Sequence, residues 1–240
     1  MVRYSDRPFY ALIPARKGSK GVPGKNRKLL QEKPLAVWTI DAALQANVFD
    51  RVVLSTDDDD LARIAQDAGA DVPFRRPEEL ASDTASSLDV ALHAADSLGW
   101  EDDAWLVLLQ PTSPFRTGED IRACIDILTK AGADACISVC PARIPLEWYK
   151  FLDEQNHLVR AVPDLISGSR RQDAQRHYVP NGAIYCIRIS VLRETGSFTP
   201  PATTAYEMPV NRSIDIDEPL DFIVAESLLK AGSIRDSTTR

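Results

Sequence analysis

Short apolar runs alternate with helical patterns along the first 140 residues, and this alternation is the strongest constraint on the fold. Runs typical of strands occupy residues 9–14, 51–56, 72–76, 104–110 and 134–140. Patterns typical of helices occupy residues 34–45, 58–70, 84–98 and 118–132. The series predicts an α/β fold with a Rossmann-like, mostly parallel sheet flanked by helices. Ligands of such sheets bind at the carboxyl ends of the strands.

The alternation stops after Cys140, where proline and arginine become more frequent. We interpret residues 143–180 as an arm inserted into one domain that spans residues 1–240, because 240 residues with 44% hydrophobic content suit a single α/β core. Trp148, Tyr149 and Phe151 lie in this arm, outside the alternating core. Exposed apolar side chains of this kind are usually buried against another protein surface. We therefore expect a homodimer.

The formal net charge of −7 and the pI near 5.1 argue against a general nucleic-acid-binding protein. Four cysteines, at positions 124, 136, 140 and 186, form neither a CxxC pair nor a zinc-type cluster. The N-terminal apolar run is too short for a signal peptide, and no later run could span a bilayer. We expect a soluble, cytoplasmic protein without nucleic-acid or membrane partners.

A basic, glycine-rich loop follows the first apolar run and opposes the acidic character of the chain. Residues 7–31 hold seven Lys or Arg and no Asp or Glu, and glycines stand at 18, 21 and 24. Because glycine lets backbone N–H groups approach an anion, we favour a phosphate site over a solvated turn. The spacing fits neither the Walker A motif nor the GxGxxG fingerprint, so the loop predicts a different kind of nucleotide site.

Two carboxylates, Asp215 and Asp217, alternate along the run SIDID, which precedes a helix with Pro219 in its first turn. On an extended strand both would project from one face, while Ile214 and Ile216 enter the core. Mg²⁺ is commonly held by one or two carboxylates plus substrate phosphates, so we predict a metal site here. The alternative is a strand whose exposed face happens to be acidic.

The acidic run at 57–60 has a structural interpretation. We expect Asp58, Asp59 and Asp60 to form the N-cap and first turn of a helix, because the helix macrodipole favours negative charge there. Asp57 could still approach a ligand.

Six stretches occur in an order that resembles one enzyme family: IPARKGSKGVPGKN, RPEELASDT, ELASDTASS, LLQPTSPFR, PNGAIY and SIDIDEPLD. Their order and spacing resemble those of the acylneuraminate cytidylyltransferases, the CMP-sialic acid synthetases, and this match covers nearly the whole chain. The resemblance implies a dimeric α/β nucleotidyltransferase that forms a CMP-sugar from CTP and a nine-carbon 2-keto sugar acid and releases pyrophosphate.

For the nucleotide, the resemblance points to the basic loop, where several cations would suit a triphosphate. Asn26 would offer the amide donor and acceptor that suit a cytosine edge. Ser82 would lie beside the nucleotide, although Ser82 or Asp83 would also cap the next helix. The expected CTP-binding residues are Arg16, Gly18, Ser19, Lys25, Asn26 and Ser82. The family's metal pair matches Asp215 and Asp217, and the expected catalytic residues are Arg16, Lys25 and Asp217.

For the sugar acid, Arg171 stands ten residues before Asn181, which is the family spacing from its substrate-binding arginine to NGAIY. A guanidinium grips a carboxylate with two parallel hydrogen bonds. Gln110 matches a glutamine that contacts the sugar. Tyr185 and Phe198 are expected to flank the acylamino group, unless Phe198 simply packs in the core. Thr199 replaces a second aromatic residue, which makes legionaminic acid a competitor to N-acetylneuraminic acid.

The expected reaction is attack by the anomeric 2-hydroxyl on the α-phosphorus of CTP, promoted by positioning and charge neutralisation without a histidine base. One alternative is a cytidylyltransferase for another 2-keto sugar acid such as 3-deoxy-manno-octulosonate, whose opening loop typically differs. The other is a non-catalytic nucleotide-binding protein on the same fold, which would be expected to lose the metal pair. Neuraminic, legionaminic and pseudaminic acids all fit the sequence.

Overall fold

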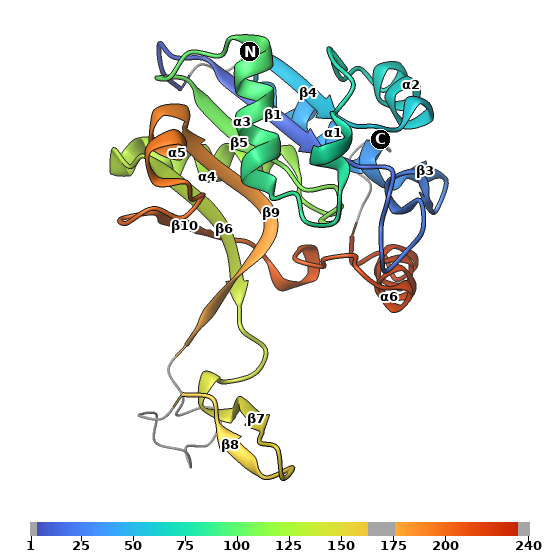
Figure 1. Cartoon of the computed structure of the whole chain (residues 1–240), viewed down its shortest axis with the longest axis vertical. Helices are drawn as coiled ribbons and strands as arrows, with labels where there is room; N and C mark the ends of the chain where they lie inside the picture. Colours follow the sequence, from blue (N-terminus) through green and yellow to red (C-terminus); the bar gives the residue numbers. More distant parts are fainter. Residues whose placement is uncertain (1–3, 163–175, 235–240) are drawn as a thin grey trace.

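The computed structural model describes residues 4–162 and 176–234, and its body is built on one six-stranded sheet (Figure 1). The sheet has the order β10-β6-β9-β5-β1-β4, and β9 is the one strand of it that runs antiparallel to its neighbours. Its strands are β1 (Phe9–Pro14), β4 (Arg51–Ser55), β5 (Trp105–Leu108), β6 (Ala135–Pro141), β9 (Tyr178–Arg188) and β10 (Thr204–Glu207). The predicted fold class is confirmed.

Helices cover both faces of the sheet, because successive strand residues point to opposite sides. One buried cluster joins Ala11 and Ile13 of β1 to α1, α2 and α4, and a second joins Leu12 to α3 and α5. A third cluster lies under α6 and includes Leu30 and Phe222. The helices are α1 (Leu35–Ala46), α2 (Asp59–Asp67), α3 (Ser87–Leu98), α4 (Gly118–Ala131), α5 (Ile189–Thr195) and α6 (Pro219–Lys230).

Within the described ranges, no helix has the length and apolar character needed to cross a bilayer.

Short elements complete the chain. Four single-turn helices and two small hairpins connect the larger elements: η1 (Lys25–Arg27), η2 (Glu78–Ala81), η3 (Leu146–Trp148), η4 (Val210–Arg212), β2 (Leu29–Leu30) with β3 (Lys33–Pro34), and β7 (Lys150–Leu152) with β8 (Leu158–Arg160).

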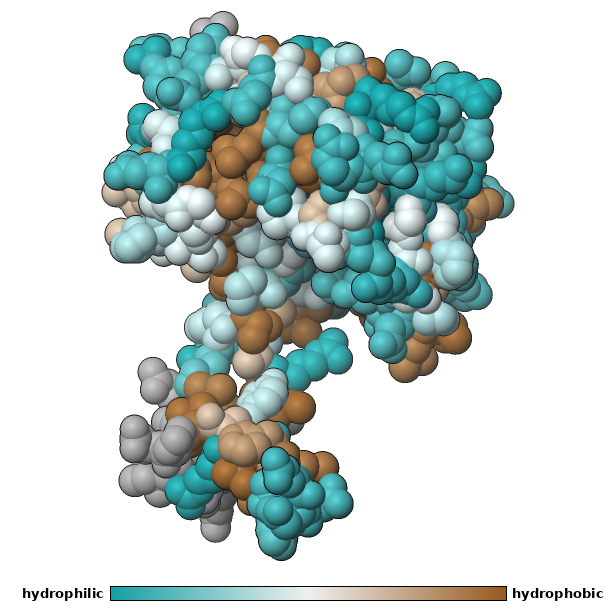
Figure 2. All heavy atoms as spheres, in the orientation of Figure 1, coloured by the Kyte–Doolittle hydropathy of each residue, from teal (hydrophilic) through white to brown (hydrophobic). Residues whose placement is uncertain are grey.

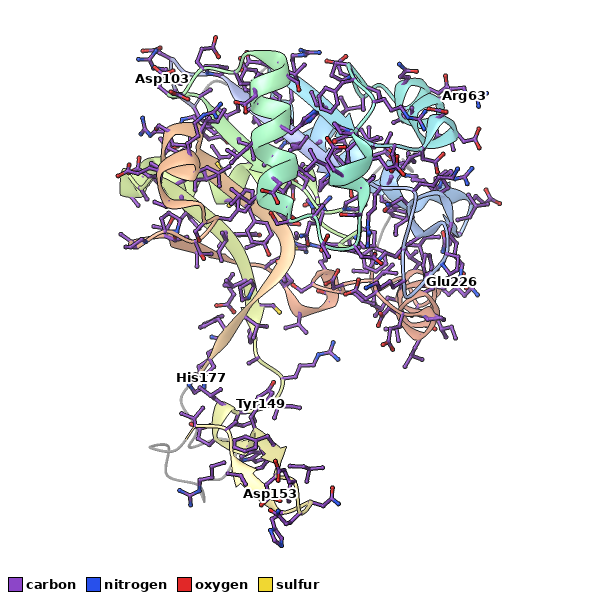
Figure 3. All side chains as sticks on the ribbon, in the orientation of Figure 1. Arg63, Asp103, Tyr149, Asp153, His177 and Glu226 are labelled. Atoms are coloured by element: carbon purple, nitrogen blue, oxygen red, sulfur yellow. The ribbon has the colours of Figure 1, made fainter. Side chains whose placement is uncertain are left out.

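The hairpin β7–β8 projects from the body as an arm, carried on the extended ends of β6 and β9 (Figure 1). Tyr149, Asp153 and His177 all lie on this arm, below the body (Figure 3). The expected inserted arm, 143–180, includes residues 163–175, which lie outside the described part of the chain. The division into one domain with an inserted arm stays a prediction.

The local predictions met with mixed outcomes. The acidic run behaves as expected, because the side chain of Asp58 caps α2 by accepting from the N–H groups of Asp60 and Leu61. The next cap was misplaced: Ser86, not Ser82 or Asp83, caps α3 in a reciprocal capping box with Asp89. The side chain of Ser82 instead donates to the carbonyl of Glu79 at 2.9 Å.

Two predicted strands are wrong. Residues 213–217 form an irregular segment and not a strand; the N–H of Ile216 donates to the carbonyl of Thr112 at 2.8 Å, and no ladder follows. Residues 72–76 make only an isolated bridge, between Thr56 and Arg75. Both segments are held by isolated hydrogen bonds rather than by a strand ladder. The strand β10 and the antiparallel direction of β9 were not predicted.

Asp120 is a buried carboxylate that ties the start of α4 to β10 and η4. The hydroxyl of Tyr206 donates to its Oδ1 at 2.7 Å, and Arg212 donates from Nη2 to the same oxygen at 2.5 Å. Burial alone would raise the pKa of Asp120, but the hydrogen bonds from Arg212, Tyr206 and Thr117 outweigh it and lower this pKa below its ordinary value.

Replacing Asp120 by alanine should therefore lower the free energy of unfolding by about 2–4 kcal/mol at neutral pH, because Arg212 would lose its carboxylate but keep some contact with water. Glu119→Ala, at the exposed neighbouring position, should change it by less than about 0.5 kcal/mol. Since the folded pKa of Asp120 is depressed, its contribution is present above the unfolded pKa and is lost in acid, so the difference should shrink toward about pH 3. Urea denaturation at both pH values measures this, and equal losses in the two variants would contradict it.

Candidate active site

A cleft with a volume of about 340 Å³ opens beyond the carboxyl ends of β1 and β5. Four parts of the chain form its walls: the basic loop, the segment from η2 to α3, the segment after β5, and residues 215–217. The lining includes every residue expected to bind CTP or metal, together with one sugar-site residue: Arg16, Gly18, Ser19, Lys25, Asn26, Ser82, Gln110, Asp215 and Asp217. The fold thus brings together residues as far apart in the sequence as Arg16 and Asp217.

Hydrogen bonds from the neighbouring segments fix the basic loop. The Nδ2 of Asn26 donates to the carbonyl of Arg16 at 2.9 Å, and the N–H of Lys17 donates to Oδ1 of Asp57 at 2.7 Å. Asp57 therefore holds the loop in place. One hydrogen of the Asn26 Nδ2 is engaged in this way, so a contact with a base could use Oδ1 as acceptor and the second Nδ2 hydrogen as donor.

Lys25 connects the loop to the carboxylate segment. Its buried Nζ donates to the carbonyl of Ile216 and to Oδ1 of Asp217, both at 2.8 Å. The backbone of Gly21 also lies directly against this segment, since a Cβ built on Gly21 would stand 2.0 Å from the carbonyl oxygen of Asp217. A glycine is required here by close approach and not by a left-handed conformation.

Arg16 is held on the other wall of the cleft. Its Nη1 lies 2.7 Å from Oδ1 of Asp83, and the exposed Nζ of Lys20 lies 3.3 Å from Oδ2 of the same carboxylate. The hydrogen bond from Arg16, followed by that from Lys20, lowers the pKa of Asp83. A phosphate that binds Arg16 would compete with this exposed carboxylate, which exchanges readily with solvent.

Arg76 is a cleft residue that the sequence did not reveal. It is buried, and it donates from Nε to Oγ of Ser55 at 3.0 Å and from Nη2 to the carbonyl of Ser55 at 2.5 Å. Burial lowers its pKa to about 10, so it remains charged at neutral pH. Arg75, next to it, forms an exposed ion pair with Asp59. No sequence pattern distinguishes the two arginines, because the distinction arises from the bridge that turns one of them inward.

Asp215 and Asp217 have the chemistry of a magnesium site. Burial raises the pKa of Asp215 and the charge of Asp217 adds to the rise, whereas the hydrogen bond from Thr112 opposes it. Among the residues that the structure describes, no group of three or more His, Cys, Asp or Glu could hold a metal. Two carboxylates that face a phosphate site suit Mg²⁺, which takes its other ligands from water and substrate, and do not suit a closed structural metal site.

The expected sugar side is only partly assembled in the cleft. Gln110 lines it, and Gly182 makes room for this side chain: a Cβ on Gly182, whose φ is +75°, would stand 2.7 Å from Oε1 of Gln110. The rings of Tyr185 and Phe198 contact each other with centroids 5.7 Å apart, but neither residue lines the cleft. Phe198 also packs against the core cluster of Leu12, as the structural alternative had it. Arg171 lies outside the described residues.

Histidine does not contribute to this cleft. All three histidines fall in the described ranges and none of them lines it. His93 of α3 contacts the ring of Phe74. His157 lies between β7 and β8, and His177 also lies on the arm (Figure 3). The cleft can therefore bind and neutralise phosphates but offers no imidazole base.

The comparisons with known proteins agree on one family. The family model described as Cytidylyltransferase matches residues 10–185. The chain is 37% identical over 229 residues to a CMP-N,N'-diacetyllegionaminic acid synthase of Legionella pneumophila, with 92% of this chain and 95% of that protein covered. It is 37% identical over 216 residues to an N-acylneuraminate cytidylyltransferase of Escherichia coli O18:K1:H7, covering 90% of this chain but 50% of that protein. The chain thus spans about half the length of the second relative.

A solved structure shares the fold. The CMP:2-keto-3-deoxy-manno-octonic acid synthetase complexed with CTP superposes with a TM-score of 0.68 at 19% identity, covering 95% of this chain and 100% of that one. At this identity the likeness concerns the fold alone.

The close approach at Gly21 generates a prediction with a matched control in the same loop. Gly21→Ala should lower the free energy of unfolding by about 1–3 kcal/mol, because the new Cβ displaces the segment that carries Asp217. Gly18→Ala has open space around its Cβ and no left-handed φ, so it should be neutral or stabilising by up to about 1 kcal/mol. Chemical denaturation of both variants measures the difference. Equal stability would show that the loop does not rest on Asp217.

Proposed function

Because this chain belongs to the cytidylyltransferase family, we propose that it joins CMP from CTP to the anomeric 2-hydroxyl of a nonulosonic acid and releases pyrophosphate. One observation carries the proposal: the cleft places Arg16, Lys25 and Arg76 around the same space as Asp215 and Asp217, with Gln110 on the adjoining wall. Three cations suit a triphosphate, two carboxylates suit its metal, and an amide suits a hydroxylated sugar.

We assign the nucleotide to the basic loop. Backbone N–H groups at Gly18 and Ser19 and the cations Arg16 and Lys25 would bind the phosphates, and Arg76 would neutralise charge from the buried side. Oδ1 of Asn26 could accept from the exocyclic amine of cytosine, and the Nδ2 hydrogen that is not bonded to the carbonyl of Arg16 could donate to an acceptor of the base. Ser82 lines the opposite wall, and its hydroxyl would have to leave the carbonyl of Glu79 in order to donate to the nucleotide.

Asp215 and Asp217 would hold Mg²⁺, whose charge would stabilise the phosphates. Lys25 keeps Asp217 in place and would be the nearest protein cation to the metal-bound phosphates. The number of ions is left open, because two carboxylates can support one ion or part of a two-ion site.

The transfer is a substitution at phosphorus. The anomeric oxygen forms a bond to the α-phosphorus, the bond from this phosphorus to the bridging oxygen of the β-phosphate breaks, and pyrophosphate leaves with the electron pair. The hydroxyl proton is lost to solvent or to a base other than histidine. The residues of this chain would act by alignment and by neutralising the charge that develops on the phosphates.

We propose an N-acyl nonulosonic acid as the acceptor. Gln110 would bind its hydroxyl groups, Tyr185 and Phe198 would contact the acylamino group, and Arg171 would bind its carboxylate. The name of the Legionella relative supports a legionaminic-type acid as a candidate beside N-acetylneuraminic acid. Thr199, which is exposed beside Phe198, makes this wall more polar than two aromatic rings would.

The experiment that tests this function measures pyrophosphate release from CTP and Mg²⁺ with a panel of acids: N-acetylneuraminic, legionaminic, pseudaminic and 3-deoxy-manno-octulosonic. Turnover should be confined to one or more of the nine-carbon acids. Turnover with only the eight-carbon acid would establish the alternative sugar class, and tight CTP binding without turnover on any acid would favour a non-catalytic nucleotide-binding protein.

Asp217→Asn should reduce turnover about 100-fold or more, since one neutralised carboxylate weakens the hold on Mg²⁺ and the pair with Lys25. The Mg²⁺ concentration for half-maximal rate should rise. Glu226→Gln, a change on α6 at a half-buried residue that does not line the cleft (Figure 3), should leave the rate unchanged. Circular dichroism checks the fold, and wild-type turnover of Asp217→Asn at ordinary Mg²⁺ would remove this residue from the site.

We further propose a homodimer formed through the arm, in a reducing cytoplasm that suits four free thiols. Figure 2 shows apolar side chains gathered on the arm. Trp148, Phe151, Leu152 and Leu158 are all at least half exposed in the described chain. Apolar surface of this kind normally marks an interface.

Leu158→Glu should therefore shift the protein toward monomer in light scattering, because it places a charge in the proposed interface. Leu44→Glu provides the control: this leucine is also exposed but lies on α1, in the body. A wild-type protein that is monomeric and fully active at assay concentration would refute the dimer.

A further inference from the structure

Arg116 is a buried cation that none of the assignments above to CTP, metal or sugar acid uses. It stands two residues before α4, is only 2% exposed and does not line the cleft. Burial lowers its pKa to about 9, and the nearby charge of Asp120 opposes this fall, so Arg116 is charged at neutral pH. Its N–H groups therefore act as strong donors inside the protein.

The guanidinium of Arg116 bridges two strands at the point where their pairing stops. The ladder of β5 and β9 ends with Leu108 opposite Tyr185. Two residues beyond this pair stand Gln110 and Ala183; Nη2 of Arg116 donates to the carbonyl of the first, and Nε donates to that of the second at 2.8 Å. Because a guanidinium is planar and rigid, it fixes the two carbonyls relative to each other.

The backbone next to this bridge determines where the side chain of Gln110 can lie. A Cβ on Gly182 would stand 2.7 Å from Oε1 of Gln110 and 3.3 Å from Oγ of Ser113. Ser113 is fully buried, and its Oγ donates to the carbonyl of Asn181 at 3.1 Å. The side chain of Gln110 is therefore packed against β9, to which Arg116 and Ser113 both tie the segment after β5.

The cost of a buried charge argues that Arg116 has a positional role. Its Nη1 has no hydrogen-bond partner in the described chain. An apolar side chain of similar length would fill the same volume without a buried charge, and such replacements are often neutral or stabilising. An apolar side chain could not, however, hold the two carbonyls.

We propose that Arg116 is a positioning residue for the sugar acid: by holding the carbonyls of Gln110 and Ala183, it fixes the side chain of Gln110 in the cleft wall. The inference rests on the function proposed above, in which Gln110 binds the hydroxyl groups of a nonulosonic acid. Arg16 and Lys25, which are assigned to CTP, are held by other carboxylates. The loss of Arg116 should therefore affect the sugar acid and not the nucleotide.

The test is steady-state kinetics of Arg116→Lys with CTP and with the nine-carbon acid that the wild type uses. An ammonium donates from a single point and cannot hold both carbonyls. The kcat/KM for the sugar acid should fall about tenfold or more, while the KM for CTP should change less than about twofold. Wild-type kcat/KM for the sugar acid, or equal losses for CTP and sugar acid, would overturn the proposal.

Arg122→Lys is the matched control and should leave both constants unchanged. Nη1 of Arg122 also donates to two backbone carbonyls, those of Gln45 at 3.0 Å and Ala46 at 3.2 Å, but the residue does not line the cleft. The same loss for the sugar acid in this variant would contradict a specific role of Arg116. If Arg116→Lys does not fold, Ser113→Ala, which removes the second tie to β9, takes its place with the same expectations.

A double-mutant cycle shows whether Arg116 acts through Gln110. In the background of Gln110→Ala, Arg116→Lys should lower the kcat/KM for the sugar acid by less than about a further twofold, because the side chain that it positions is already gone. An undiminished loss in that background would mean that Arg116 acts by another route and would overturn the proposal.

The position of Gln110 can also be followed without turnover. The side-chain amide signals of Gln110 in NMR spectra, identified by their loss in Gln110→Ala, should shift in Arg116→Lys and stay in place in Arg122→Lys. Unchanged signals in Arg116→Lys would overturn the proposal. Shifted signals in a protein that turns over no sugar acid would support the role of Arg116 and refute the proposed function alone.

Discussion

The bond between Lys25 and Asp217 holds together the two parts of the chain that make the cleft. These residues stand 192 positions apart, and the ammonium that joins them is buried against the carbonyl of Ile216. The charge of Lys25 also favours the ionised form of Asp215, so the loss of this cation would leave the negative charges of Asp215 and Asp217 less compensated. Gly21 packs closely against the backbone of Asp217, so close packing and the ion pair with Lys25 join the loop to the same residue. The position of the loop and the geometry of the metal pair therefore depend on each other.

The charge balance of the cleft gives a physical reason for a metal. Three cations, Arg16, Lys25 and Arg76, face three carboxylates, Asp83, Asp215 and Asp217. A triphosphate would add several negative charges to a site that is close to neutral. Asp83, whose side chain is 43% exposed, can release Arg16 to a phosphate at low cost. An added divalent cation on the other two carboxylates would restore the balance, which is the argument for Mg²⁺ independent of family resemblance.

The sequence predicts best those structural features that depend on residues close together along the chain. The strands around Ala11 and Val107 and the helix capped by Asp58 follow from short apolar runs and caps, so they were predictable. The cleft residues of the basic loop were predictable from composition, because glycines and cations serve phosphates wherever the loop lies. The strand predicted at residues 213–217 is wrong, although alternating Ile and Asp are typical of a strand. The segment is instead irregular, and the N–H of Ile216 donates to the carbonyl of Thr112. Arg76 could not be found, because its burial results from the bridge between Thr56 and Arg75.

The arginines of this protein differ in what holds them, and that difference indicates their role. Arg212 meets Asp120 in a pair that is complete in itself and belongs to the framework. Arg76 and Arg116 are buried against carbonyl oxygens, and burial lowers the pKa of each while leaving it charged. A carbonyl fixes the orientation of a guanidinium without cancelling its charge. Arg76 lines the proposed triphosphate cleft, whereas Arg116 is buried and holds the carbonyls of Gln110 and Ala183. A guanidinium that is fixed by the backbone and lines a cleft, as that of Arg76 does, is prepared for an anionic ligand, because no side chain must be displaced before the ligand binds.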